Sequence, residues 1–378
     1  MPPSPLRTVI ATSFTPTLDS GRARRTHGIV RALAGLGSVD LVYGAFGADE
    51  PDPAYQQIAG LTMHRVERPG GLERLPAYAR ARLRRVPEDF ARGIWPGVAR
   101  RTAELSQDPE TRVVAEGPVA AAALLGLARR REAVYDSHNL ESTFRHRLDD
   151  AGMSQSELER FERLLLSTFS ESWMVSPADM EGAAALAPGA NLRLVPNVVD
   201  VAAIEPVPPR ADERRVLFVA DLTYEPNRGA LTFLLEEAMP ALWERAPEVE
   251  LVVAGKGSSE IETTDERVRP SGFVPDLRDV YLEAGAVAVP LLEGGGSPLK
   301  FVEALAYRVP VAATPRAAAG LEVQAGEHYV EGGTDGASFA AALLEAMEPA
   351  KGNPLAAAGR ELAEREYSIE ALERRLSS

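Results

Sequence analysis

The sequence contains no cysteine, and this absence excludes both disulfide bonds and thiolate metal sites. We therefore expect the protein to work in the reducing environment of the cytoplasm. The chain also lacks an apolar run long enough for a signal-peptide core or a membrane span. Lysine is scarce, because only 3 of the 41 basic residues are lysines, at Lys256, Lys300 and Lys351.

Positive charge is also in deficit, since the net charge is −14. The excess of acids lies in the second half: residues 1–210 carry 25 arginines and 26 acids, whereas residues 211–378 carry 16 basic residues and 29 acids. Nucleic-acid binding rewards a basic face, so we expect no nucleic-acid partner. Neither an aspartate-rich motif nor metal-spaced histidines are visible, and we expect no metal and no permanently bound cofactor.

A length of 378 residues predicts two domains. Short β-branched runs alternate with helical patterns in both halves, which is typical of βαβ units and parallel sheets. The predicted strands are residues 8–13, 39–43, 61–66, 112–115, 133–136, 172–175 and 192–195, then 215–219, 251–254, 267–269, 286–289 and 309–313. The predicted helices are residues 22–36, 119–131, 154–169, 230–245, 277–283, 298–307, 336–347 and 357–376.

The proline-rich segment 205–210 predicts a linker between the halves. The fold class is therefore α/β, with two Rossmann-like domains whose parallel sheets face a shared cleft. We assign residues 1–204, joined by residues 362–378, to the first domain and residues 205–361 to the second. Ligands of such sheets bind at the carboxyl ends of the strands.

A triple glycine, formed by Gly294, Gly295 and Gly296, follows an apolar strand and allows close approach of the backbone to a ligand. Ser297 is a good N-cap and Pro298 suits the first position of the next helix. That helix would aim its free amides at the glycines, which favours a bound phosphate.

Lys300 lies in the first turn of this helix, where a cation opposes the dipole unless an anion is present. Glu303 lies three residues later on the same face and could accept the hydroxyls of a ribose. The alternative is an ordinary strand–loop–helix joint in which Lys300 and Glu303 form a solvated pair.

This segment resembles the donor-binding motif of glycosyltransferase family 4, which comprises retaining enzymes of the GT-B fold. Many members carry two glutamates eight positions apart. By resemblance the second is Glu303, which binds the donor ribose, whereas the first falls on Gly295 and is missing. The chain looks like a subgroup with a triple glycine and a lysine before the glutamate, in which Lys300 is the diphosphate cation.

Other segments resemble donor-binding parts of the same family. Most members place an arginine where this chain has Asp221, which leaves more phosphate charge to Lys300. Other positions also have a purely structural alternative to donor binding. Pro226–Asn227 could form a turn that starts a helix at Arg228, and Phe273 and Val274 could pack in the core. The residues before Gly21 could simply cap a helix. The resemblance assigns donor contacts to Gly21, Tyr224, Asn227, Gly255, Lys256, Phe273, Val274, Gly294, Gly295, Gly296, Ser297, Lys300 and Glu303.

The stretch YDSHNLES ends a predicted strand, and its His138 matches a family histidine that lines the reaction centre. We take His138, Lys300 and Glu303 as the catalytic set. The alternative for His138 is a supporting histidine held by Asp136. Three further residues are assigned to the acceptor side: Arg22, Arg25 and Asn139.

The resemblance implies a retaining glycosyltransferase that moves a sugar from a nucleotide-diphosphate sugar, with a UDP or GDP base, to a hydroxyl of a polysaccharide, a glycolipid or a secondary metabolite. Front-face attack without a metal would place the acceptor proton on the leaving diphosphate. The alternative is a GT-B-fold sugar-nucleotide epimerase or a non-catalytic partner that binds nucleotide sugars.

Residues 71–101 hold eight arginines against three acids. The interleaved apolar residues are Leu72, Tyr78, Leu83, Phe90, Ile94 and Trp95. Three interpretations remain open: an acceptor-binding lid, peripheral contact with the inner face of a membrane, or helices that simply cover the core.

Overall fold

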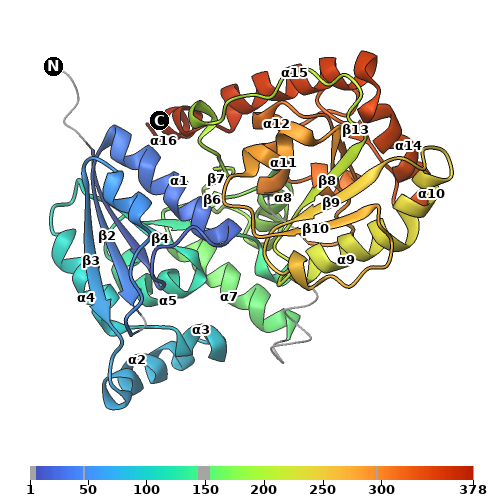
Figure 1. Ribbon diagram of the computed structural model, residues 1–378. Coiled ribbons are helices and arrows are strands. Elements are labelled where there is room, and N and C mark those ends of the chain that lie inside the picture. The colour runs from blue at the N-terminus through green and yellow to red at the C-terminus, as the bar shows by residue number, and fades with distance from the viewer. Residues whose placement is uncertain (1–5, 46, 144–153, 295–296, 378) are drawn as a thin grey trace. The chain divides into compact units, whose positions relative to one another are not determined.

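The computed structural model describes residues 6–45, 47–143, 154–294, and 297–377. It divides the chain into two compact units, residues 1–196 with 372–378, and residues 197–371 (Figure 1). The sequence placed these boundaries at 204/205 and 361/362. Among the described helices, none is both long and apolar enough to cross a membrane.

The first unit is built on a seven-stranded sheet in the order β3-β2-β1-β4-β5-β6-β7, and every neighbouring pair is parallel. Its strands are β1 (Leu6–Thr12), β2 (Gly37–Ala45), β3 (Leu61–Glu67), β4 (Arg112–Glu116), β5 (Val134–Asp136), β6 (Glu171–Met174) and β7 (Leu192–Leu194). Its helices are α1 (Gly21–Leu36), α2 (Gly71–Leu83), α3 (Glu88–Arg92), α4 (Pro96–Leu105), α5 (Gly117–Ala128), α7 (Gln155–Thr168), α8 (Pro177–Leu186) and most of α16 (Ile369–Ser377).

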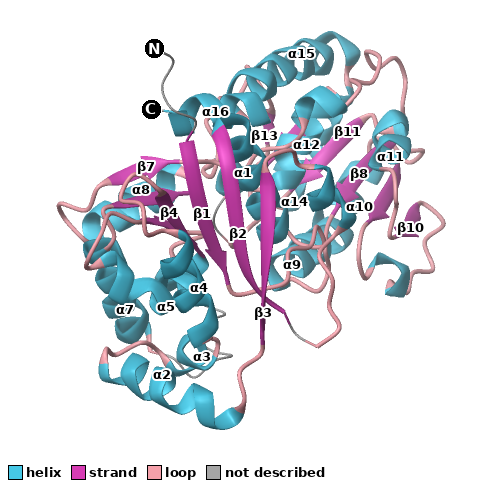
Figure 2. Ribbon diagram, turned by 90° about the vertical axis from the view of Figure 1, so that its left-hand side faces the viewer, coloured by secondary structure: helices cyan, strands magenta, loops and turns pink. Residues whose placement is uncertain are grey.

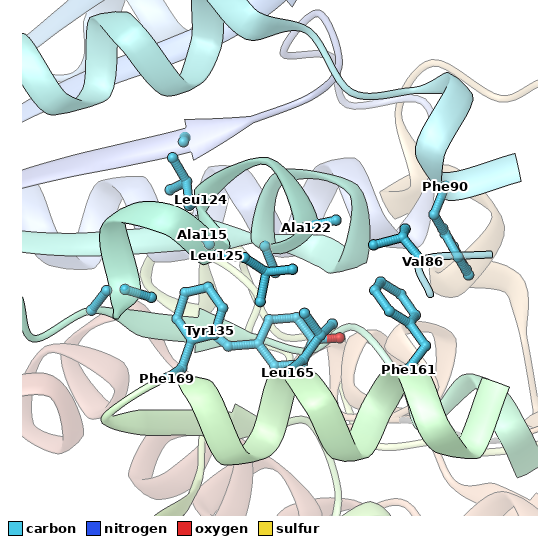
Figure 3. Close-up of a cluster of buried hydrophobic side chains, with 14 of the residues drawn as sticks. Val86, Phe90, Ala115, Ala122, Leu124, Leu125, Tyr135, Phe161, Leu165 and Phe169 are labelled. Atoms are coloured by element: carbon cyan, nitrogen blue, oxygen red, sulfur yellow. The ribbon is translucent and has the colours of Figure 1, made fainter. Parts of the chain in front are cut away.

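Alternate residues of the strands face the two sides of this sheet. Val9 and Ala11 of β1 belong to one core cluster with residues of α4, α5 and α7. Figure 3 shows part of this cluster, including Leu125 of α5 and Leu165 of α7. The crossover through α1 runs in the opposite direction along the sheet from that through α5, so right-handed connections place α1 on the other face. The C-terminal helix α16 lies beside α1, where a side chain at Gly35 would collide with Glu373 (Figure 2). The predicted return of the C-terminus to the first domain is confirmed.

The second unit is built on a six-stranded parallel sheet in the order β10-β9-β8-β11-β12-β13. Its strands are β8 (Arg215–Val219), β9 (Glu250–Ala254), β10 (Val268–Gly272), β11 (Ala286–Val289), β12 (Val311–Ala313) and β13 (Val330–Glu331). Its helices are α9 (Glu225–Phe233), a π-helical turn (Leu234–Ala238), α10 (Met239–Trp243), α11 (Leu277–Glu283), α12 (Leu299–Tyr307), α13 (Pro315–Ala318), α14 (Gly336–Met347) and α15 (Pro349–Glu366). The two predicted Rossmann-like domains are confirmed.

Three local predictions differ from the structure. The segment 205–210 is not a free linker, because Val207 and Arg210 are buried in the second unit and Arg210 donates to the carbonyl oxygen of Leu282 at 2.8 Å. The predicted helix 357–376 is broken into α15 and α16. Tyr367 is buried at the break, and the hydroxyl of Ser368 caps α16 by accepting from the amide of Ala371. The two-residue strand β13 was not predicted.

Candidate functional site

The strand order of the second sheet reverses between β8 and β11, and ligands of open α/β sheets bind at such a switch point. The loops that leave these two strands lie against each other. Gly294 has a φ of +99°, and a Cβ there would lie 3.4 Å from Cβ of Pro226 and 3.7 Å from the hydroxyl of Tyr224. The structure therefore brings the glycine loop and the Tyr224–Pro226 turn together. Gly295 and Gly296 lie outside the described residues.

The start of α12 differs from the prediction by one residue. Ser297 does not cap the helix, because α12 begins at Leu299 after Pro298 and has no side-chain cap. The carbonyl oxygen of Ser297 instead accepts from Nδ2 of Asn197 at 2.8 Å, which ties this residue to a separate loop. Its buried hydroxyl has no hydrogen-bond partner within the described part of the chain.

Lys300 points from α12 toward the loop after β8. Its Nζ donates to Oδ1 of Asn227 at 2.6 Å and lies 4.9 Å from the ring centre of Phe218. Burial lowers the pKa of Lys300 to about 7, although the carboxylate of Glu303 acts in the opposite direction. Glu303 is buried on the same helix. The alternative in which Lys300 and Glu303 form a solvated pair is therefore excluded, and the ammonium group of Lys300 is partly desolvated.

Asn227 orders this loop. It lies in the first turn of α9, which begins at Glu225, so the alternative of a turn that starts a helix at Arg228 does not match the structure. Its Nδ2 donates to the carbonyl oxygen of Asp221 at 2.8 Å. The carboxylate of Asp221 accepts from the amide and hydroxyl of Thr223, at 2.9 and 2.6 Å. Asp221 thus stabilises a turn in this chain.

The loop after β9 lies beside the loop after β8. Gly255 has a φ of +120°, and a Cβ there would lie 2.1 Å from the carbonyl oxygen of Ala220, so only glycine fits. The amide of Leu222 donates to the carbonyl oxygen of Lys256 at 2.9 Å. The Lys256 side chain is exposed.

Phe273 and Val274 follow β10 and differ in burial. Phe273 is 77% exposed, so core packing is excluded for it. Val274 packs against the core cluster of the second unit. An exposed aromatic ring beyond the end of a strand is available to stack on a planar ligand.

The first unit also has a switch point, between β1 and β4, and a buried carboxylate occupies it. Glu116, the last residue of β4, accepts from the hydroxyls of Thr12 at 2.5 Å and Thr26 at 2.7 Å. Its Oε1 lies 2.6 Å from Nε2 of His138. Burial raises the pKa of Glu116, but the charges of His138 and Arg22 and the hydrogen bonds outweigh it and lower the pKa to about 2.

Sequence reasoning missed Glu116. The available signal was a lone acid that ends the apolar strand VVAE and precedes a glycine. His138 contacts this carboxylate, so the alternative in which Asp136 holds the histidine does not match the structure.

Asp136 has a different partner. Arg25 is buried and donates to Oδ1 of Asp136 at 2.5 and 3.2 Å and to the carbonyl oxygen of Val195 at 2.7 Å. Arg25 is therefore a structural residue inside the first domain, and its acceptor-side assignment is wrong because the guanidinium is enclosed.

The remaining predicted residues of the first unit lie near the start of α1 or after β5. Gly21 is the first residue of α1, and Ser20 caps the helix by accepting from the amide of Ala23 at 3.3 Å. The guanidinium of Arg22 lies over the ring of Phe14, 3.5 Å from its centre. Asn139 follows His138 and accepts through its carbonyl oxygen from the hydroxyl of Ser137 at 2.8 Å.

Solved structures resemble the whole chain at low sequence identity. A sucrose-phosphate synthase from Thermosynechococcus elongatus aligns with a TM-score of 0.73 at 17% identity, over 98% of this chain and 96% of that one. Anabaena Alr3699/HepE in complex with UDP-glucose aligns with a TM-score of 0.71 at 15% identity, over 98% of both chains. The lipopolysaccharide outer core galactosyltransferase WaaB aligns with a TM-score of 0.60 at 13% identity, also over 98% of both.

The sequence itself matches a family model. Residues 213–349, which span β8 to α14, match the model described as glycosyl transferases group 1. A comparison with curated proteins gave no match. The matched segment contains the whole cluster around Lys300 and Asn227, and the two-domain fold is that of the structural neighbours. Residues 213–349 are therefore similar to the group 1 glycosyl transferases, and the whole chain has the two-domain fold of the solved glycosyltransferases.

Proposed function

We propose that the donor is a UDP-sugar and that the second domain binds it through the cluster around Lys300. The observation that carries this proposal is the half-buried ammonium of Lys300, whose hydrogen bond goes to the neutral amide of Asn227. A diphosphate beside Lys300 would compensate the burial of its charge. The similar solved structures include Anabaena Alr3699/HepE in complex with UDP and with UDP-glucose, which favours uridine over guanosine.

The other donor contacts follow from their positions around this lysine. Glu303, one helical turn further on, accepts the ribose hydroxyls. The exposed ring of Phe273 stacks on the base. Because Asp221 replaces the usual arginine, Lys300 carries the phosphate charge that two cations share in most relatives, as in the triple-glycine subgroup.

His138 is proposed to touch the transferred sugar or the acceptor from the first domain. Transfer then proceeds by front-face attack, in which the leaving diphosphate takes the acceptor proton and Lys300 stabilises its developing charge. Gly21, at the positive end of α1, is the further donor contact of this domain.

Calorimetry with UDP, GDP and TDP tests the donor site. We expect UDP to bind most tightly and Lys300→Ala to weaken its affinity at least tenfold. Lys351→Ala is the matched control, because Lys351 is an exposed lysine of α15 that pairs with Glu345 and Glu348. Equal affinity of the wild type and Lys300→Ala for UDP would contradict the phosphate assignment, and tighter binding of GDP would contradict the base.

We further propose that α2 contacts a membrane that carries a glycolipid acceptor. Phe90, Ile94 and Trp95 are buried in the core, so they are not part of an interface. In contrast, Leu72 and Leu83 of α2 are 84% and 85% exposed. A solvent-exposed apolar stripe costs free energy unless something covers it.

Helical spacing places the exposed residues Leu72, Leu75 and Leu83 on one stripe of α2, with Arg80 and Arg82 on its two sides. Ala77 and Tyr78, on the opposite side of the helix, pack on the core. An apolar stripe flanked by cations fits the interface of an anionic bilayer better than an acidic acceptor, which would need no leucines.

Flotation with vesicles of anionic or zwitterionic lipid tests this contact. We expect binding to anionic vesicles, and its loss in the variant Leu72→Ser, Leu83→Ser. The control variant Arg129→Ser, Arg130→Ser removes two positive charges from an exposed pair just after α5 and no apolar side chain. It is expected to leave binding unchanged. No binding of the wild type to anionic vesicles would overturn the membrane proposal.

A further inference from the structure

Glu116 is a buried charge at the point where the strand order of the first sheet reverses. Only 3% of it is exposed, and a carboxylate in this position is tolerated only if its oxygens have partners. Thr12, at the end of the neighbouring strand β1, donates to Oε2, and Thr26 of α1 donates to Oε1. These two bonds fix the orientation of the carboxylate from two different elements.

The third partner of Glu116 is the imidazole of His138, in the loop after β5. Nε2 lies 2.6 Å from Oε1, a distance at which a protonated ring forms an ion pair with the carboxylate. The low pKa of Glu116, about 2, means that the carboxylate is ionised and can only accept. A proton shared between these two atoms therefore belongs to Nε2 of the histidine.

Gly117 leaves room for the ring of His138. It has a φ of +76°, and a Cβ there would lie 2.8 Å from Cε1 and 3.3 Å from Nδ1 of His138. A side chain at this position would displace the ring. The absence of a side chain at Gly117 therefore allows the imidazole of His138 to lie next to the turn between β4 and α5.

Two carboxylates of neighbouring helices also fix the loop that carries His138. The amide of Leu140 donates to Oδ1 of Asp179 at 3.0 Å, and the amide of Ser142 donates to the carboxylate of Glu162 at 3.3 Å. Both acids belong to helices, α8 and α7, which pack on the core. The ring of His138 thus contacts Glu116, and the residues that follow it in the loop are held by two further carboxylates.

We propose that Glu116 and Gly117 position His138 for glycosyl transfer: Glu116 holds the Nε2 proton, so that Nδ1 is the ring nitrogen left to contact a sugar hydroxyl. Glu116 is a positioning residue and does not itself touch the substrate. The inference rests on the proposed role of His138 at the reaction centre.

The tautomer of His138 can be measured directly by NMR on protein labelled with ¹⁵N-histidine, because the chain has only five histidines. The resonance of His138 is assigned by its absence in His138→Asn. We expect the neutral wild-type ring to carry its proton on Nε2, and Glu116→Gln to lose this fixed pattern. A proton on Nδ1 in the wild type would overturn the proposal whatever the donor is.

Thr12→Val is the matched control for a merely structural role of the cluster. It removes the hydrogen bond to Oε2 and leaves the contact between Oε1 and His138. We expect a lower melting temperature with an unchanged tautomer. If Thr12→Val and Glu116→Gln change the ring in the same way, the cluster is structural and Glu116 has no separate positioning role.

A double-mutant cycle on the hydrolysis of UDP-glucose links the tautomer to catalysis. We expect Glu116→Gln to lower kcat about tenfold or more, with an unchanged calorimetric affinity for UDP, and to have no further effect in a His138→Ala background. Full activity of His138→Ala would refute the proposed role of the histidine. A loss in His138→Ala that adds to an independent loss in Glu116→Gln would refute the positioning role alone.

Discussion

Nζ of Lys300 donates a hydrogen bond to Oδ1 of Asn227 at 2.6 Å. The two residues are 73 positions apart and belong to the helices that follow β11 and β8. The same asparagine donates from Nδ2 to the carbonyl oxygen of Asp221, so its amide is fixed in one orientation. In the free protein the half-buried ammonium of Lys300 therefore donates this hydrogen bond to a neutral acceptor, and the next two predictions depend on this contact.

The affinity for UDP should depend on pH through Lys300. Its pKa is about 7 in the free protein, and a bound diphosphate raises it, so binding takes up a proton above pH 7. Affinity is then expected to fall by up to about tenfold per pH unit between pH 7.5 and 9. Calorimetry in buffers with different ionisation enthalpies counts the proton. Lys300→Arg keeps its charge throughout this range and should lose the slope; an equal slope in both proteins would contradict the prediction.

Lys300→Met should stabilise the protein while it abolishes UDP binding. The pKa of Lys300 is lowered on folding from 10.5 to about 7, so the unfolded state binds more protons between these values. The penalty of the buried charge is complete below pH 7 and decreases as the pH rises toward 10. The free energy of unfolding from urea titration should therefore rise by about 1–3 kcal/mol at pH 6.5, and by much less at pH 9.5. If Lys300→Met is less stable than the wild type at pH 6.5, the lysine side chain stabilises the fold and the prediction is wrong.

Gly255→Ala should destabilise the second domain. The added methyl group would lie 2.1 Å from the carbonyl oxygen of Ala220, at a φ of +120°. We expect a loss of about 2–4 kcal/mol in the free energy of unfolding, together with weaker UDP binding. The control is Gly229→Ala, on the exposed side of α9 with no atom near the new Cβ, which should gain about 0.5–1 kcal/mol. Equal effects of both substitutions would disagree with this loop geometry.

Arg25→Met should destabilise the first domain by about 3–5 kcal/mol, because it leaves the carboxylate of Asp136 buried without its cation. Arg7 pairs with Asp40 at the surface at 3.2 Å, and Arg7→Met should cost less than about 1 kcal/mol. Chemical denaturation measures both. If Arg25→Met instead kept its stability and lost only acceptor turnover, the original acceptor-side assignment would be restored.

Most of the fold could be predicted from the sequence because its signals are local. β-branched runs define β8 and β11 to the residue, and helical periodicity defines α11 and α14. The glycine at 294, which has a positive φ, and the capping serine at 20 are likewise properties of a few neighbouring positions. Local signals failed at ends and breaks, such as the start of α12, and for short elements such as the two-residue strand β13.

The partners of the buried charges could be decided only by the tertiary structure. Arg25 and Asp136 are 111 positions apart, and Glu116 reaches Thr12 across 104 positions, so no spacing rule connects them. Exposure is equally non-local: Leu83 is exposed and Phe90 is buried although both read as apolar helix positions. The sequence by itself determined two parallel-sheet domains and a lysine beside a glycine loop. Only the tertiary structure decided that His138 lies against Glu116. A buried carboxylate needs polar partners, and these come from strands and loops that are distant in the sequence.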